Sequence, residues 1–134
     1  MLRQSADDAA TVVAAGVTLH EALKAADELK KEGVNLRVID LYSVKPVDRE
    51  TLLAAARATS NTLLVVEDHF AEGGLGEAVM SALAGEGVRV VQLAVRAMPV
   101  SGKPEELLDA MGISARHIAA RARQLAAETA RTPR

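Results

Sequence analysis

Residues 11–23, TVVAAGVTLHEAL, contain the pattern that decides the fold. A short run rich in β-branched residues ends at Gly16, and apolar residues then recur at helical spacing from Leu19 onward. Thr18 and Glu21 have the spacing of a capping box, so we expect the Thr18 hydroxyl and the Glu21 carboxylate to cap the first turn of this helix. A strand that leads through a glycine into a helix is typical of the repeating unit of α/β proteins.

The strand-then-helix pattern repeats along the whole chain. Short apolar runs predict further strands at residues 36–41, 62–67 and 88–95, and a helix with one apolar face follows each run. Asp48 and Ser114 stand at the capping positions of two of these helices. The run at residues 62–67 does not alternate with polar residues, which is typical of a parallel strand covered on both faces. Right-handed crossovers would then build a three-layer α/β/α sandwich.

The composition indicates one globular domain, which we assign to residues 1–134, with a polar tail at residues 129–134 that we expect to fray. The net charge of -2 is too small to attract nucleic acid or an anionic membrane, and one Tyr and one Phe offer little stacking surface for bases. The absence of Cys excludes disulfides and thiol nucleophiles. No run approaches the roughly 20 apolar residues that span a bilayer. We therefore expect a cytoplasmic protein with no nucleic-acid or membrane partner.

The segment at residues 67–77, EDHFAEGGLGE, contains the best candidate functional residues. It joins a strand to a helix at the carboxyl edge of the sheet, where α/β proteins usually bind ligands. We predict an interface or regulatory loop whose glycines permit a tight turn and whose polar groups cap the backbone or contact another protein. His20, from the first helix, is included because it lies near the same sheet edge. The predicted residues are His20, Asp68, His69, Glu72, Gly73 and Gly74.

Three other uses of this loop are weaker on chemical grounds. Its glycine N–H groups suit a phosphate, but the loop holds four acidic residues and no Lys or Arg. Asp68, His69 and Glu72 have the ligand types for a metal, yet their spacing matches no strong motif. His69 suits a general base, but no nucleophile with an orienting partner can be recognised. We therefore assign no catalytic, cofactor-binding or metal-binding residue to this chain.

Four segments, which together cover nearly the whole chain, carry a resemblance to a known family. They are residues 11–23, 38–52 (VIDLYSVKPVDRETL), 65–79 (VVEDHFAEGGLGEAV) and 93–113 (LAVRAMPVSGKPEELLDAMGI). In this order they resemble the C-terminal domain of transketolase. The same domain type occurs in the β subunits of 2-oxoacid dehydrogenases and in deoxyxylulose-phosphate synthase, but SGKPEELL is more similar to transketolase. Val100 departs from the family, in which many members have Arg before this segment.

The resemblance implies a more detailed fold than the pattern does. It implies a mixed five-stranded sheet in the order 1-3-2-4-5, with an antiparallel N-terminal strand at one edge. In this chain that edge strand would fall at residues 1–4, where the pattern alone gives only a weak strand signal.

The resemblance also implies a function for a larger protein. Family enzymes belong to the pentose phosphate pathway and transfer a two-carbon ketol unit between sugar phosphates, using thiamine diphosphate and a divalent ion, Mg or Ca. The Gly-Asp-Gly motif for that cofactor is absent from this sequence, and no catalytic residue of the family maps onto it. We therefore expect an inactive, cofactor-free domain that serves packing, dimerisation or regulation. Its expected partners are the N-terminal and pyrimidine-binding domains, within a homodimer of the full enzyme.

Two alternatives of different classes remain at this point. The chain can be the corresponding domain of a 2-oxoacid dehydrogenase β subunit or of deoxyxylulose-phosphate synthase. It can also be a stand-alone module that binds a small ligand through residues 68–76. The start of the sequence, just before the segment that resembles the family domain, favours a piece of a longer protein or one part of a split enzyme.

Overall fold

The computed structural model describes residues 1–98 and 100–132, and strands and helices alternate along it as the sequence predicts. In chain order the elements are β1 (Ala10–Ala14), α1 (Val17–Lys31), β2 (Leu36–Asp40), α2 (Arg49–Ala58), β3 (Thr62–Phe70), α3 (Leu75–Ala82), β4 (Arg89–Val95), α4 (Pro104–Ala110) and α5 (Ala115–Arg131). The predicted strands are confirmed within one residue at most ends. The exception is β3, which continues three residues past residue 67 to pair Phe70 with Val95.

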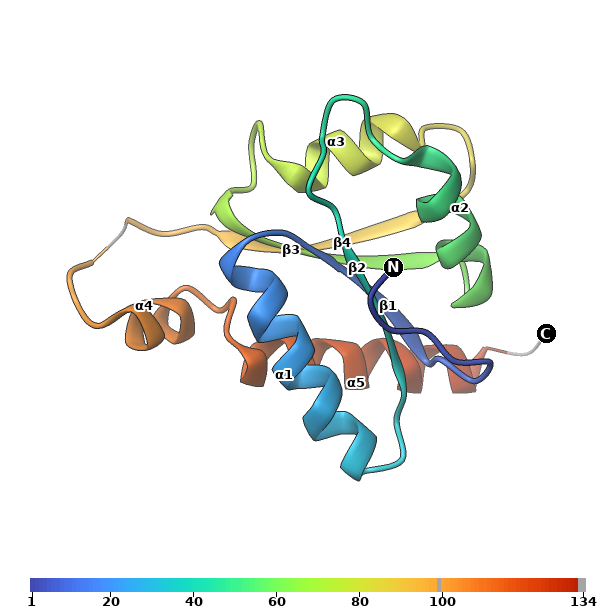
Figure 1. The fold of residues 1–134 in the computed structure, drawn as a ribbon, viewed down its shortest axis with the longest axis horizontal. Helices are drawn as coiled ribbons and strands as arrows, with labels where there is room; N and C mark the ends of the chain where they lie inside the picture. The colour runs from blue at the N-terminus through green and yellow to red at the C-terminus, as the bar shows by residue number, and fades with distance from the viewer. Residues whose placement is uncertain (99, 133–134) are drawn as a thin grey trace.

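The strands form one parallel sheet in the order β2-β1-β3-β4. Figure 1 shows α2 and α3 on one face of this sheet and α1 and α5 on the other. The predicted α/β arrangement, with helices on both faces, is therefore confirmed. The short helix α4 lies beyond the carboxyl ends of the strands rather than over a sheet face (Figure 1).

The predicted fifth strand is not confirmed. In the described residues the sheet has four strands, and the N-terminal segment meets β2 at an isolated antiparallel bridge between Arg3 and Val38. The pairing ends there because the backbone N–H of Ser5 donates to the Asp8 carboxylate at 2.9 Å, which turns the chain away from β2. One bridge of this kind does not make a mixed five-stranded sheet.

Strands β1, β2 and β3 bury side chains on both faces of the sheet, whereas the edge strand β4 is only partly buried along most of its length. Val12, Val38 and Leu64 pack against α1 and α5, while the alternate residues Val13 and Val65 pack against α2 and α3. All five side chains are fully buried. Burial of one such side chain stabilises the fold by about 1.5–3 kcal/mol. Two covered faces explain why the strands read as unbroken apolar runs in the sequence.

Helix capping follows the sequence at α2 and departs from it at α1 and α5. Ser114 precedes α5 as predicted, but its hydroxyl donates to Asp109 and does not cap the helix. The Asp48 carboxylate accepts from the backbone N–H of Thr51 at 3.1 Å, as predicted for α2, and hydrogen bonding from the Thr51 side chain and backbone holds the pKa of Asp48 below its usual range. The predicted capping box of Thr18 and Glu21 is wrong. The Thr18 hydroxyl instead donates to the carbonyl of Val66 at 2.9 Å, and the Glu21 carboxylate caps α5 by accepting from Ala115 N–H at 2.8 Å.

The last helix is longer than the sequence suggested. It continues through residues 129–131, which we expected to fray, and the last two residues of that predicted tail lie outside the described residues. None of the helices in the described part of the chain combines the length and the apolar character that crossing a membrane requires.

Candidate functional site

The sheet order creates a crevice at the carboxyl ends of β1 and β3. The chain leaves β1 toward β2 on one side and returns from β2 to β3 on the other side. Such a reversal separates the loops that follow the two central strands, and α/β proteins bind ligands there. In this protein the crevice is a groove of about 610 Å³, lined by the loops after β1, β2 and β3.

The centre of this groove is already occupied by a side chain of the protein. The Glu67 carboxylate, at the end of the buried part of β3, accepts from the backbone N–H groups of Leu75 at 2.9 Å and Gly76 at 2.7 Å. Glu67 is only 4% exposed. These donors at the start of α3 are the ones that a phosphate would use. Phosphate binding at α3 would therefore require displacement of Glu67.

Two glycines allow this close approach. A Cβ atom added to Gly74 would overlap the Glu67 carboxylate, and one added to Gly76 would overlap the Gln92 side chain. Gly73 adopts φ 73°, a conformation that favours glycine because it has no Cβ. The glycines of this loop therefore permit a tight turn and close packing.

The other predicted loop residues point outward or lie at the rim. Asp68, His69 and Glu72 are exposed, and His69 Nδ1 donates to the Phe70 carbonyl oxygen at 2.6 Å. His69 Nδ1 also lies 3.9 Å from the Glu67 carboxylate. Within residues 1–98 and 100–132, no three acidic or histidine side chains come close enough together to hold a metal ion.

The predicted residues are only partly brought together. Asp68, His69, Gly73 and Gly74 line the groove, whereas Glu72 and His20 are exposed and do not line it. His20 occupies the first turn of α1 but contributes nothing to the wall that contains His69.

A second hollow was not predicted from the sequence. It measures about 270 Å³ and lies between α4 and the carboxyl ends of β3 and β4. Its walls are mainly apolar, and they include Leu107, Leu108 and Met111 from α4 and the turn after it. The signal in the sequence was the pair Leu107 and Leu108 on a short helix, of which only Leu108 joins the main core.

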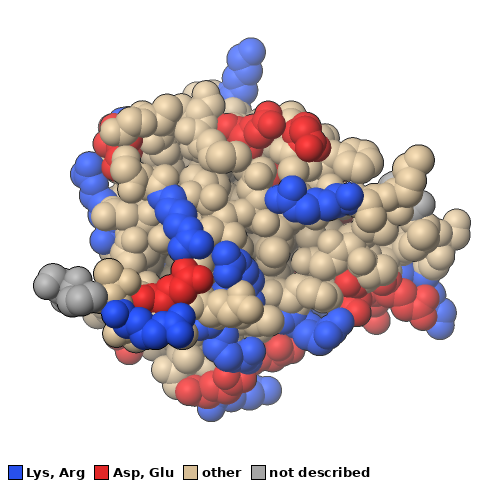
Figure 2. Space-filling model, turned by 180° about the vertical axis from the view of Figure 1, so that it is seen from behind, with Lys and Arg blue, Asp and Glu red and all other residues tan. Residues whose placement is uncertain are grey.

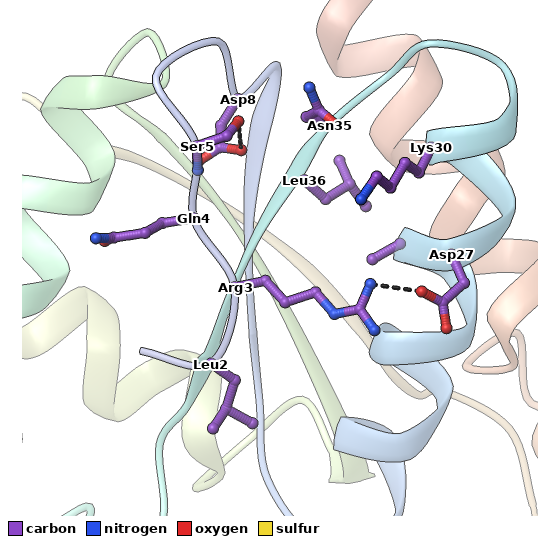
Figure 3. Close-up of a pocket in the computed structure, with 10 residues that line it drawn as sticks. Leu2, Arg3, Gln4, Ser5, Asp8, Asp27, Lys30, Asn35 and Leu36 are labelled. Atoms are coloured by element: carbon purple, nitrogen blue, oxygen red, sulfur yellow. Dashed lines mark hydrogen bonds and ion pairs between the residues drawn. The ribbon is translucent and has the colours of Figure 1, made fainter.

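A third hollow lies at the outer edge of β2 and is polar. It measures about 650 Å³, and Figure 3 shows Arg3 reaching across it from the N-terminal segment to Asp27 on α1. The two charged groups approach to 2.5 Å. Lys30 stands at the rim of the hollow, and Gln4 points away from α1 (Figure 3). Because Asp27 neutralises Arg3, the hollow offers no concentrated charge for a ligand.

One cluster outside these hollows contains a serine, a histidine and an aspartate. The Ser114 hydroxyl lies 2.9 Å from both Asp109 Oδ1 and His117 Nδ1, and Asp109 Oδ1 lies 3.5 Å from the same ring nitrogen. A catalytic relay needs the acid and the nucleophile on different ring nitrogens. Asp109 is also bound by the Arg116 guanidinium, which, together with Ser114, holds the pKa of Asp109 below its usual value. The cluster therefore closes the turn between α4 and α5 and is not a hydrolase site.

The charges of the described residues are interspersed on the face shown in Figure 2. Uncharged atoms predominate at the side of this view where the strands end. On the face shown, this side therefore carries fewer charged side chains than the helical surface beside it.

The comparisons with known proteins agree with one another. The model of the transketolase C-terminal domain matches residues 1–118. Over 90% of its length the chain is 57% identical to mouse transketolase-like protein 2, and over 91% it is 55% identical to human transketolase. These matches cover 19% and 20% of the two relatives, so the chain spans about a fifth of their length.

Solved structures show the same relationship. A split-gene transketolase, described as an inactive β4 tetramer, has a TM-score of 0.82 and 36% identity over 92% of this chain and 40% of its own. A transketolase mutant from Pichia stipitis shares the fold at a TM-score of 0.67 and 20% identity, over 93% of this chain and 17% of its own. With the family model matching most of its length, the chain belongs to the transketolase C-terminal domain family.

Proposed function

We propose that this chain is the C-terminal domain of a thiamine diphosphate-dependent transketolase, a cytoplasmic transferase of the pentose phosphate pathway. In this proposal the whole enzyme moves a two-carbon ketol unit between sugar phosphates as a homodimer. The domain itself supports packing and dimerisation and takes no part in the chemistry. The N-terminal and pyrimidine-binding domains supply the cofactor site.

One observation carries the non-catalytic role. At the crevice where an α/β domain would bind an anionic ligand, the Glu67 carboxylate occupies the backbone donors of α3. The described residues also contain no group of acidic or histidine side chains that fits the divalent ion of the cofactor. The residues present therefore do not fit thiamine diphosphate with Mg or Ca.

The exposed loop residues have a role in contacts rather than in catalysis. We assign His20, Asp68, His69, Glu72, Gly73 and Gly74 to an interface or regulatory loop. Support comes from the outward position of Asp68, His69 and Glu72, while Glu67 and the glycines hold the backbone beneath them. The alternatives from dehydrogenase β subunits and deoxyxylulose-phosphate synthase are not favoured, because the relatives at 55–57% identity are transketolases and transketolase-like proteins.

A full-length chimera tests this function. The chain replaces the matched segment of human transketolase, and ketol transfer from xylulose 5-phosphate to ribose 5-phosphate is measured with thiamine diphosphate and Mg²⁺. We expect turnover by the chimera and none by the 134-residue chain alone. Calorimetry of the isolated chain at millimolar cofactor should give no saturable heat. Turnover or saturable binding by the isolated chain would contradict the proposal.

A further inference from the structure

We propose that the carboxyl-edge surface of this domain docks against another domain of the same transketolase, through apolar side chains that surround a contact between Asp68 and a Lys or Arg of that domain. This inference rests on the proposed function and identifies the face and the chemistry of the contact.

Exposed apolar side chains gather on this face. Every strand is followed by at least one of them, or ends in one: Phe70 ends β3, Val17 begins α1 after β1, and the others lie in loops after β2 and β4. We define the carboxyl-edge surface by these six residues, which stand at 42–87% exposure: Val17, Tyr42, Val44, Phe70, Met98 and Val100. The other large apolar side chains exposed in the described residues are Met1, Leu2 and Met80, of which Met1 lines a separate hollow beside Tyr42. Large apolar side chains exposed on one face are typical of an interaction site.

The surface also contains hollows into which side chains of a docking partner can fit. The groove of about 610 Å³ and the apolar hollow of about 270 Å³ adjoin each other, because Val17 and Asp68 line both. Two adjoining hollows can receive side chains that project from a partner, as the well-packed core of an interface does.

Asp68 gives the contact its charge requirement. It lies where the two hollows meet, and its side chain is exposed. The neighbouring Glu67 is buried and bound to Leu75 and Gly76, so it is not available to a partner. A carboxylate at the centre of an apolar contact needs an opposite charge when it loses water. The partner should therefore present a Lys or Arg among aliphatic groups.

A second copy of this chain fits the surface poorly. In a two-fold interface the same patch meets itself, so a residue near its centre lies close to its own copy. Asp68 would then face Asp68, and like charges at a contact are unfavourable. A different domain does not have this problem. The longer relatives have room for such a domain, because the match to this chain covers only 20% of human transketolase and 40% of the split-gene chain.

Hydrogen exchange in the human transketolase chimera tests the location of the contact. Amides of Tyr42, Phe70 and Met98 should exchange at least about tenfold more slowly in the chimera than in the isolated chain, because docking removes this surface from water. Amides of Gly85 and Gly87, in the turn between α3 and β4, should exchange equally in both proteins.

Matched substitutions test its chemistry. Val17→Lys and Asp68→Lys should remove the added protection in the chimera, whereas Ala130→Lys and Glu28→Lys, at exposed positions away from this surface, should retain it. Each variant of the isolated chain should keep its thermal midpoint within a few degrees, because all four positions are exposed to solvent. Circular dichroism of the isolated variants verifies this.

The outcomes separate the two proposals. A wild-type chimera that neither assembles nor transfers ketol groups would refute the proposed function, and the docking partner with it. An active chimera whose carboxyl-edge amides exchange as in the isolated chain would refute the docking surface alone. Sedimentation provides a third outcome. If the isolated chain dimerises and Val17→Lys abolishes the dimer, a second copy is the occupant and this inference is wrong.

Discussion

The Glu21 carboxylate of α1 accepts a hydrogen bond at 2.8 Å from the backbone N–H of Ala115, which lies 94 residues later at the start of α5. Glu21 is 7% exposed, and its other oxygen accepts from Lys24 at 3.0 Å. A negative charge at a helix N-terminus is favourable, because the first N–H groups of a helix have no partner within it. This contact joins the two helices that cover one face of the sheet.

Removal of this carboxylate should therefore destabilise the whole domain. For Glu21→Ala we expect the free energy of unfolding to fall by about 1–3 kcal/mol, since a buried N–H loses its acceptor. Glu28→Ala, an exposed position on the same helix, should change it by less than about 0.5 kcal/mol. Urea unfolding of both variants measures the difference. Equal effects would show that the contact contributes nothing beyond helix propensity.

The stability of the domain should depend on the negative charge and both acceptor oxygens of Glu67, and not only on the size and shape of its side chain. Glu67→Gln keeps one acceptor oxygen but turns an NH₂ group toward a backbone donor. We expect a loss of about 1–3 kcal/mol in unfolding free energy and faster hydrogen exchange at Leu75 and Gly76. The control is Glu72→Gln, an exposed acid in the same loop, which should be close to neutral. Unchanged exchange at the two amides would contradict the assigned hydrogen bonds.

Gly74 should tolerate no side chain. A Cβ atom there would overlap the Glu67 carboxylate, so Gly74→Ala must displace Glu67 or shift the start of α3. We expect a loss of about 1–3 kcal/mol, the usual cost of overpacking a filled site. Gly102→Ala provides the matched comparison, because its nearest contacts would be ordinary ones at 3.5 Å. Thermal unfolding of the two alanine variants should separate them clearly, and equal midpoints would show that the loop has room to adjust.

Acid should weaken the turn between α4 and α5. Hydrogen bonds from Arg116 and Ser114 hold the pKa of Asp109 below its usual value of 3.8 in the folded protein. A lowered pKa means that the unfolded chain binds the proton more readily, so this stabilisation is complete above about pH 3.8 and is lost as the pH falls through the folded pKa. We expect the unfolding midpoint of Asp109→Asn to fall less steeply than that of the wild type in this acidic range.

The Arg116→Gln variant checks the cause of this effect. Without the guanidinium, the pKa of Asp109 should return toward its usual value, and the acid dependence should resemble that of Asp109→Asn. Urea midpoints at neutral and acidic pH measure both variants. A wild-type dependence in Arg116→Gln would assign the effect to Ser114 instead.

Local sequence determined the elements and the α/β class of this protein. The apolar runs at residues 36–41 and 62–67 predicted β2 and β3, because a strand buried on both faces needs apolar side chains at consecutive positions. Asp48 was predicted as the cap of α2 because its partner, Thr51, is three residues away. Interactions within one turn depend on spacing that can be read along the chain.

Tertiary structure decided what the polar groups at the sheet edge contact. Thr18 and Glu21 have the spacing of a local cap, but their partners are Val66 and Ala115, 48 and 94 residues away. The N-terminal segment makes only one bridge to β2 in the described residues, because the Ser5 N–H donates to the Asp8 carboxylate and not to β2. The carboxyl-edge surface also exists only in the folded domain, since the parallel sheet brings together loops from four separate parts of the chain. No local sequence pattern predicts these long-range contacts, because each depends on how the helices pack against the sheet.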